Sequence, residues 1–170
     1  MTIIPVFRGM RIIVLCNDQQ KKELNVTDTV LRSEIIWLDH IDKLRNPPNA
    51  DAIIDLLFEN SPERIKLLKN TSAAIIIINS VVNTLAETDV SLVRINGWNT
   101  FLGSPLIEAA ALAANKALAE SIMIVFEKQI IWVPDEPGFI TPRIISMIIN
   151  EAFISFEEGV SLKNDIDIAI

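Results

Sequence analysis

Short, almost wholly apolar runs rich in Ile and Val recur along the chain and alternate with polar or helix-forming segments. Runs of four to seven residues are typical of strands that are buried on both faces of a parallel sheet. The sequence therefore predicts strands at 11–15, 34–38, 52–58, 73–79, 92–95 and 130–133. The segment 106–112 stays open, since its alanines favour a helix whereas a strand would complete the alternation.

Helical segments fall between these runs. Polar residues 18–24 favour a helical turn, and Ser61, Pro62 and Glu63 form a helix start that should run to Lys69. Apolar residues recur with a helical period over 115–128. The longest predicted helix begins at Thr141 or Pro142, ends near Glu158 before a capping Gly159, and has these apolar residues on one face: Ile145, Ile148, Ile149, Ala152, Phe153 and Phe156.

A last helix begins at 164–165. Alternating strands and helices predict an α/β fold: a Rossmann-like, mostly parallel sheet with flanking helices and right-handed crossovers, ending in a long C-terminal helix. Residues 45–49 should form a loop, because Pro47 and Pro48 each bias the residue before them away from the helical region.

Composition removes several classes of function. The mean hydropathy is +0.37, yet no apolar run approaches the roughly 18 residues that span a bilayer, so no membrane partner is expected. The net charge is −7 and no basic cluster exceeds Lys21–Lys22, which argues against a nucleic-acid partner. With Cys16 as the single cysteine and His40 as the single histidine, neither an internal disulfide nor a protein-only zinc site is expected, and the predicted location is cytoplasmic.

Four motifs follow one another near the carboxyl end: DEPGFITPR at 135–143, NEA at 150–152, EEG at 157–159 and DIDIA at 165–169. Upstream, Asn79-Ser80 follows an apolar run, and Glu108 lies twelve positions after Asn96. In this order and spacing the chain resembles the 3-hydroxyacyl-CoA dehydrogenases, as a truncated and degenerate member. The resemblance implies a degenerate NAD-binding domain over 1–140, and over 141–170 the long helix and the start of the family's C-terminal helical domain.

In that family a His paired with a Glu takes the proton of the 3-hydroxyl while hydride passes to NAD, and a Ser and an Asn help to bind the substrate. Carried onto this chain, the resemblance places Glu108 and Ser80 at family positions, Asn96 at the His position and Pro142 at the second Asn position. Asn99 is a further candidate for substrate binding. A carboxamide cannot accept a proton near pH 7 as imidazole does, so no residue is assigned as catalytic.

The segment expected to bind the cofactor departs from the family as well. A dinucleotide fingerprint needs glycines after the first strand, and residues 16–23 contain none. Asp18 would add negative charge beside a phosphate, while Asp39 lies where the family has its ribose-binding acid. No cofactor is therefore expected; NAD would be the cofactor only if the chain is an active oxidoreductase, the alternative given below. Asp39 with His40 is also explained as a strand-end loop pair, and Glu108 as a solvated or helix-N-terminal carboxylate.

These residues predict a relative that has lost redox catalysis and acts as a binding or oligomerising module, with an acyl-CoA as a candidate ligand. The apolar face of the 141–158 helix needs cover, either from the sheet or from a second copy, and a second copy paired through this helix is the expected partner. The alternative is an active oxidoreductase on a 3-hydroxyacyl-CoA or related hydroxy acid, with an atypical NAD site. For Trp98, covering a pocket and plain apolar packing both stay open.

Overall fold

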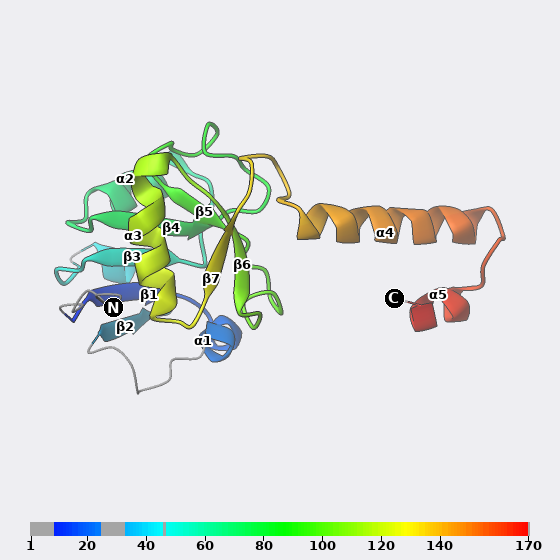
Figure 1. Ribbon diagram of the computed structural model, residues 1–170, viewed down its shortest axis with the longest axis horizontal. Coiled ribbons are helices and arrows are strands. Elements are labelled where there is room, and N and C mark those ends of the chain that lie inside the picture. Colours follow the sequence, from blue (N-terminus) through cyan, green and yellow to red (C-terminus); the bar gives the residue numbers. More distant parts are fainter. Residues whose placement is uncertain (1–8, 25–32, 46, 170) are drawn as a thin grey trace, which may run out of the picture.

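A computed structural model describes residues 9–24, 33–45 and 47–169 of the chain. Its centre is a seven-stranded sheet with the order β2-β1-β3-β4-β5-β6-β7 (Figure 1). The first five of these run parallel; β6 is antiparallel to β5, and β7 runs parallel to β6. The strands are β1 (Arg11–Leu15), β2 (Glu34–Leu38), β3 (Ala52–Asp55), β4 (Ile75–Asn79), β5 (Val93–Ile95), β6 (Leu106–Ala110) and β7 (Gln129–Trp132). The predicted Rossmann-like α/β fold is confirmed.

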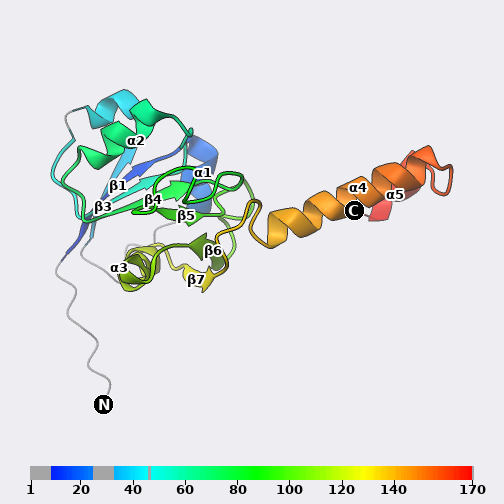
Figure 2. The ribbon, with the colours of Figure 1, turned by 90° about the horizontal axis from the view of Figure 1, so that it is seen from above.

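Helices cover both faces of the sheet, with α2 and α3 on opposite sides (Figure 2). Alternate residues of β1 enter two separate cores, with Ile12 and Val14 facing one and Ile13 and Leu15 the other. The longest helix, α4, extends away from the sheet, and α5 folds back beside it. The helices are α1 (Asp18–Leu24), the 3₁₀ helix η1 (Ile41–Leu44), α2 (Pro62–Lys69), α3 (Ala113–Ile124), α4 (Thr141–Glu157) and α5 (Lys163–Ala169). No helix in the described ranges is long and apolar enough to cross a membrane.

Local chemistry explains the helix ends that the sequence predicts. The Ser61 side chain accepts a hydrogen bond from the Arg64 amide at 3.2 Å, with Pro62 as the first residue of α2. After α4, Gly159 adopts a φ of +70°, and the Val160 amide bonds back to the Ser155 carbonyl. This geometry closes the helix as a glycine C-terminal cap, as expected.

Several predicted boundaries need correction, and one open segment is assigned. The helix predicted over 115–128 spans Ala113–Ile124. The strand predicted over 52–58 ends at Asp55, because the Asp55 carboxylate accepts the Leu57 amide at 3.1 Å and turns the chain. The strand predicted from 73 begins at Ile75. The segment left open at 106–112 forms β6 over Leu106–Ala110, since it pairs with β5 on one side and with β7 on the other. The 45–49 loop is irregular wherever it is described, and Asn46 lies outside the described residues.

A buried ion pair ties β3 to α2. Asp55 is fully buried and meets Arg64 through two hydrogen bonds, of 2.8 Å from Nε and 2.7 Å from Nη2. The same guanidinium donates to the Leu57 carbonyl at 3.1 Å. Bidentate pairing of this kind fixes geometry as well as charge, so Arg64 holds the turn that ends β3.

Replacing Arg64 should therefore be costly. Arg64→Ala leaves the Asp55 carboxylate buried without its cation, and we expect the free energy of unfolding to fall by about 3 to 5 kcal/mol in urea titrations. The matched control is Arg45→Ala, which breaks an exposed Arg45–Asp42 pair and should cost less than about 1 kcal/mol. Equal losses in the two variants would contradict this assignment.

Candidate functional site

The turn between β1 and α1 is closed by its own side chains. The backbone N–H of Gln20 donates to Asn17 Oδ1 at 2.8 Å, and the backbone N–H of Asn17 donates to Gln20 Oε1 at 3.0 Å. This reciprocal arrangement is a capping box at the start of α1. Gln20 is almost fully buried, and its Nε2 also donates to the Leu56 carbonyl at 3.1 Å. Main-chain amides that a phosphate would use at a helix start are thus bound to protein oxygens.

The residues around this turn do not fit the pyrophosphate of NAD. Cys16 follows β1 and is buried, and burial raises the pKa of its thiol to about 11, so it stays a neutral packing residue. Asp18 is exposed at the first position of α1 and would place a negative charge beside a phosphate. Glu23 accepts the Thr100 amide at 2.8 Å, which ties the loop after β5 to α1. The buried carboxamide of Gln20, the lack of a glycine in the turn and the nearby carboxylate of Asp18 all oppose the binding of an anionic ligand here.

Asp39 lies directly after β2, as the resemblance predicts, but its carboxylate faces η1. Asp39 Oδ1 pairs with Lys43 Nζ at 2.6 Å, and this hydrogen bond lowers the pKa of Asp39 from its usual value. The neighbouring His40 accepts the Asp42 amide on Nδ1 at 3.3 Å and so caps η1. Each of the two side chains thus has a local partner in the strand-end loop.

Asn96 and Glu108, which the resemblance places at catalytic positions of the family, come together. Asn96 is nearly buried after β5, and its Nδ2 lies 3.4 Å from Glu108 Oε2 on β6. Glu108 Oε1 accepts two hydrogen bonds from Thr141, one from the amide at 2.9 Å and one from Oγ1 at 2.8 Å. Glu108 therefore anchors the first turn of α4, where a carboxylate also meets the positive end of the helix dipole. Pro142 follows, buried in that same turn.

Polar residues after β4 are also engaged within the protein. Ser80 Oγ donates to the Asn83 carbonyl at 2.9 Å. Asn79 donates to the Leu56 carbonyl at 3.3 Å and accepts the Gly97 amide at 2.9 Å. A Cβ on Gly97 would lie 2.8 Å from Asn79 Cγ, so this close approach requires glycine. Asn99 lies exposed in the following turn.

Arg94, which was not among the predicted site residues, joins the segments at the carboxyl edge of the sheet. It is fully buried in β5 and donates to the Ser80 carbonyl at 3.0 Å and the Val81 carbonyl at 3.1 Å. Its guanidinium pairs with Asp135 and lies 4.4 Å from the centre of the Phe139 ring. The DEPGF motif is thereby fixed to the end of β4. The available signal was a lone arginine inside the apolar run LVRI.

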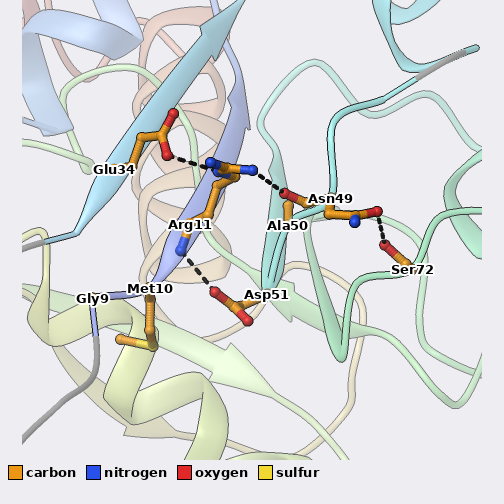
Figure 3. Close-up of a pocket in the computed structure, with 8 residues that line it drawn as sticks. All are labelled: Gly9, Met10, Arg11, Glu34, Asn49, Ala50, Asp51 and Ser72. Atoms are coloured by element: carbon orange, nitrogen blue, oxygen red, sulfur yellow. Dashed lines mark hydrogen bonds and ion pairs between the residues drawn. The ribbon is translucent and has the colours of Figure 1, made fainter.

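Two of several hollows in the described structure lie at opposite edges of the sheet. The larger, about 590 Å³, lies where the strands begin, and its polar residues pair with one another (Figure 3). There Arg11 Nε contacts Glu34 at 2.7 Å and the Arg11 amide donates to Asp51 at 2.8 Å. A cleft of about 330 Å³ lies at the other edge, lined mainly by Val82, Trp98 and the first turns of α4. Open α/β sheets bind ligands at the carboxyl ends of their strands, so the smaller cleft is the candidate site.

No group of His, Cys, Asp and Glu in the described residues could hold a metal ion. The cleft instead combines apolar walls with a few polar groups at its rim, among them Arg143 and Asn150 of α4. Such a lining suits an apolar group whose polar end is recognised at the rim.

Comparison with known proteins gives a consistent picture. No protein-family model matches the chain. The chain is 27% identical over 156 residues to a probable 3-hydroxybutyryl-CoA dehydrogenase of Bacillus subtilis (strain 168), a match that covers 83% of this chain and 54% of the relative. It thus spans about half the length of that protein.

Solved structures support the fold. The (S)-3-hydroxybutyryl-CoA dehydrogenase of Ralstonia eutropha superimposes with a TM-score of 0.65 at 18% identity, over 93% of this chain and 75% of that one. A 3-hydroxyacyl-CoA dehydrogenase of Archaeoglobus fulgidus gives a TM-score of 0.64 at 15% identity, over 94% and 67%. The resemblance indicated by the carboxyl-terminal motifs is thereby confirmed.

The anchoring role of Glu108 can be tested directly. Glu108→Ala removes the acceptor of the Thr141 amide and hydroxyl, so the first turn of α4 should loosen and the free energy of unfolding should fall by about 1 kcal/mol. Glu108→Gln retains an acceptor oxygen and should keep most of that stability. Hydrogen exchange at the Thr141 amide is the direct measurement. Unchanged exchange in Glu108→Ala would remove the anchoring role.

Proposed function

We propose that this chain, given its confirmed resemblance to the 3-hydroxyacyl-CoA dehydrogenases, does not carry out NAD-dependent oxidation and acts as a binding or oligomerising module. The observation that carries the proposal is the closed β1–α1 turn. The side-chain oxygens of Asn17 and Gln20 each accept a hydrogen bond from the other residue's backbone N–H, and the buried Gln20 side chain donates to the Leu56 carbonyl. Opening this turn to a pyrophosphate would break three hydrogen bonds and expose buried amide groups, each at a cost in free energy.

The proton-transfer step also has no evident acceptor. Oxidation of a hydroxyl requires a base within hydrogen-bond reach of it, with a pKa suited to neutral pH. Asn96 carries a carboxamide, which is not such a base. The oxygens of Glu108 already accept hydrogen bonds from Thr141 and Asn96. The arrangement therefore supports a structural role for the pair.

The cleft beside Trp98 is the binding site in this proposal. Its walls are mainly apolar, and Arg143 at its rim is half-exposed. An acyl-CoA would suit both features, with the acyl chain against the apolar wall and an anionic part of the CoA near the guanidinium. This places the proposed ligand at the carboxyl edge without any contact to the β1–α1 turn.

If the chain does not carry out redox chemistry, a titration with NADH should show no binding. Purified chain should neither enhance nor shift NADH fluorescence, and should not oxidise 3-hydroxybutyryl-CoA in the presence of NAD. Restoring the family residues with Asn96→His and Pro142→Asn should create no turnover, because the β1–α1 turn stays closed. Turnover by the unaltered chain would instead establish the alternative, an active oxidoreductase with an atypical NAD site.

Ligand binding predicts a gain in stability. Butyryl-CoA at about one hundred times its dissociation constant should stabilise the folded chain by about 2.7 kcal/mol, measured as a rise in the thermal unfolding temperature. Trp98→Ala should abolish most of this gain, whereas Trp132→Phe, on β7 outside the cleft, should retain it. Free CoA serves as the ligand control for the acyl chain. An absent shift with butyryl-CoA would leave only the oligomerising role.

A further inference from the structure

The strand β7 forms one edge of the sheet, and its outer side, called here the β7 edge, has no partner strand among the described residues (Figure 1). From Gln129 to Val133 this strand and the residue after it include neither a charged residue nor a proline. Charged side chains and prolines are common means by which native edge strands avoid pairing with a further chain. The β7 edge is thus open to an additional strand.

The pairing with β6 determines which main-chain groups of β7 face outward. The N–H groups of Gln129 and Val133 both donate to carbonyls of the segment 105–109. Along a strand, the main-chain groups of successive residues point to opposite sides in the plane of the sheet. The N–H and C=O groups of Ile130 and Trp132 therefore face the β7 edge, where an added strand can form hydrogen bonds with all four of them.

A hollow of about 450 Å³ is lined by the end of α3, the start of β7 and the turn between them. Its apolar lining includes Ile130 and also Ile124, which is 53% exposed. Glu120 and Glu127 add two carboxylates, whereas Lys128 is buried and its Nζ donates to a main-chain carbonyl at 2.9 Å. This lining suits a side chain that has an apolar stem and a positively charged end.

The two faces of β7 would receive alternate side chains of an added strand. Ile130 and Trp132 pack on the core beneath α3, so a residue opposite Ile130 points toward the hollow. Ile131 lies on the other face and is 42% exposed, so a residue opposite it meets an apolar surface. The β7 edge therefore distinguishes a basic residue from an apolar one at adjacent positions.

Charge argues against a second copy as the added strand. Antiparallel pairing of two β7 strands about a two-fold axis at Ile131 would bring Glu120 and Glu127 of both copies to one seam, where like charges are destabilising. Glu120 is held beside the strand, because its Oε1 accepts a hydrogen bond from Trp132 Nε1 at 2.6 Å. Lys116 lies over the Trp132 ring at 4.9 Å and does not line the hollow. A basic partner has the complementary charge.

We propose that the β7 edge binds an extended, basic peptide segment of another protein, which adds antiparallel to β7 as a further strand. The peptide residue opposite Ile130 is lysine or arginine, with its stem on Ile124 and its charge near Glu120. The residue before it is β-branched and apolar, and lies opposite Ile131. Main-chain hydrogen bonds supply the affinity and these two side chains supply the selectivity. The proposal goes beyond acyl-CoA binding, which uses the cleft beside Trp98.

Fluorescence anisotropy on the full chain tests the pairing with the labelled peptide Thr-Val-Thr-Val-Arg-Val-Thr. N-methylation of its Arg removes the N–H that would donate to the Ile130 carbonyl, and should weaken binding about tenfold. N-methylation of the Val just before that Arg is the matched control. Its N–H points away from β7, so binding should change less than about twofold. No binding at about 1 mM peptide, or equal losses with the two methylated peptides, would overturn the proposal.

Amide hydrogen exchange locates the bound peptide. The peptide should slow exchange at Ile130 and Trp132, whereas the N–H of Ile131 faces β6 and serves as the internal reference. Unchanged exchange at Ile130 and Trp132 with peptide bound would place the peptide elsewhere and contradict the assignment. Protection of these two amides that rises with protein concentration, in the absence of peptide, would instead identify a second copy as the occupant and overturn the proposal.

A charge exchange tests the role of the hollow. Glu in place of Arg in the peptide should weaken binding about fivefold, and the variant Glu120→Lys should restore the binding of this altered peptide. Glu151→Lys, at an exposed position of α4, changes the net charge by the same amount and should restore nothing. Equal rescue by the two variants, or rescue by neither, would remove the assigned contact. Butyryl-CoA should not compete with the peptide, so these results are distinguishable from the tests of the proposed function.

Discussion

The arrangement at the carboxyl edge of the sheet depends on one buried cation. Arg94 is enclosed in β5, and its guanidinium joins the carbonyls that follow β4 to the Asp135 carboxylate. A buried guanidinium requires both an opposite charge and acceptors for its remaining donors, and the chain supplies them from two distant segments. Because Asp135 also accepts the Leu85 amide at 2.9 Å, the start of the DEPGF motif is held from two sides. The direction in which α4 leaves the sheet follows from this anchor.

The same edge shows polar side chains that are used by the fold itself. Asn79 joins the Leu56 carbonyl to the Gly97 amide, and Gln20 reaches the same carbonyl from α1. Side-chain amides carry both a donor and an acceptor, so they can bridge main-chain groups that would otherwise point into a binding crevice. Networks satisfied in this way rigidify the edge, whereas an anion site needs free donors. The two uses of these amides are mutually exclusive.

The sequence predicted the strands well because each is a continuous apolar run with polar ends, and buried parallel strands need nothing more. It failed where one side chain decides the backbone path. Asp55 ends β3 early by accepting the Leu57 amide, an event that no hydrophobic pattern records. The link between Asn96 and Glu108 came from the family resemblance alone, because the antiparallel pairing of β5 and β6 that brings them together was not predicted. The contacts of Arg94 were not, because its partner lies 41 residues away and is reached only after folding.

Glu108 connects the edge of the sheet to the surface of α4. Its carboxylate holds the first turn of the helix through Thr141, while Arg94 holds the segment just before it through Asp135. Both ends of the 135–141 connection are thus held to the sheet, and this sets the direction in which α4 and its exposed apolar side chains project. A carboxylate that the resemblance places at a catalytic position of the family thereby determines where the helix begins.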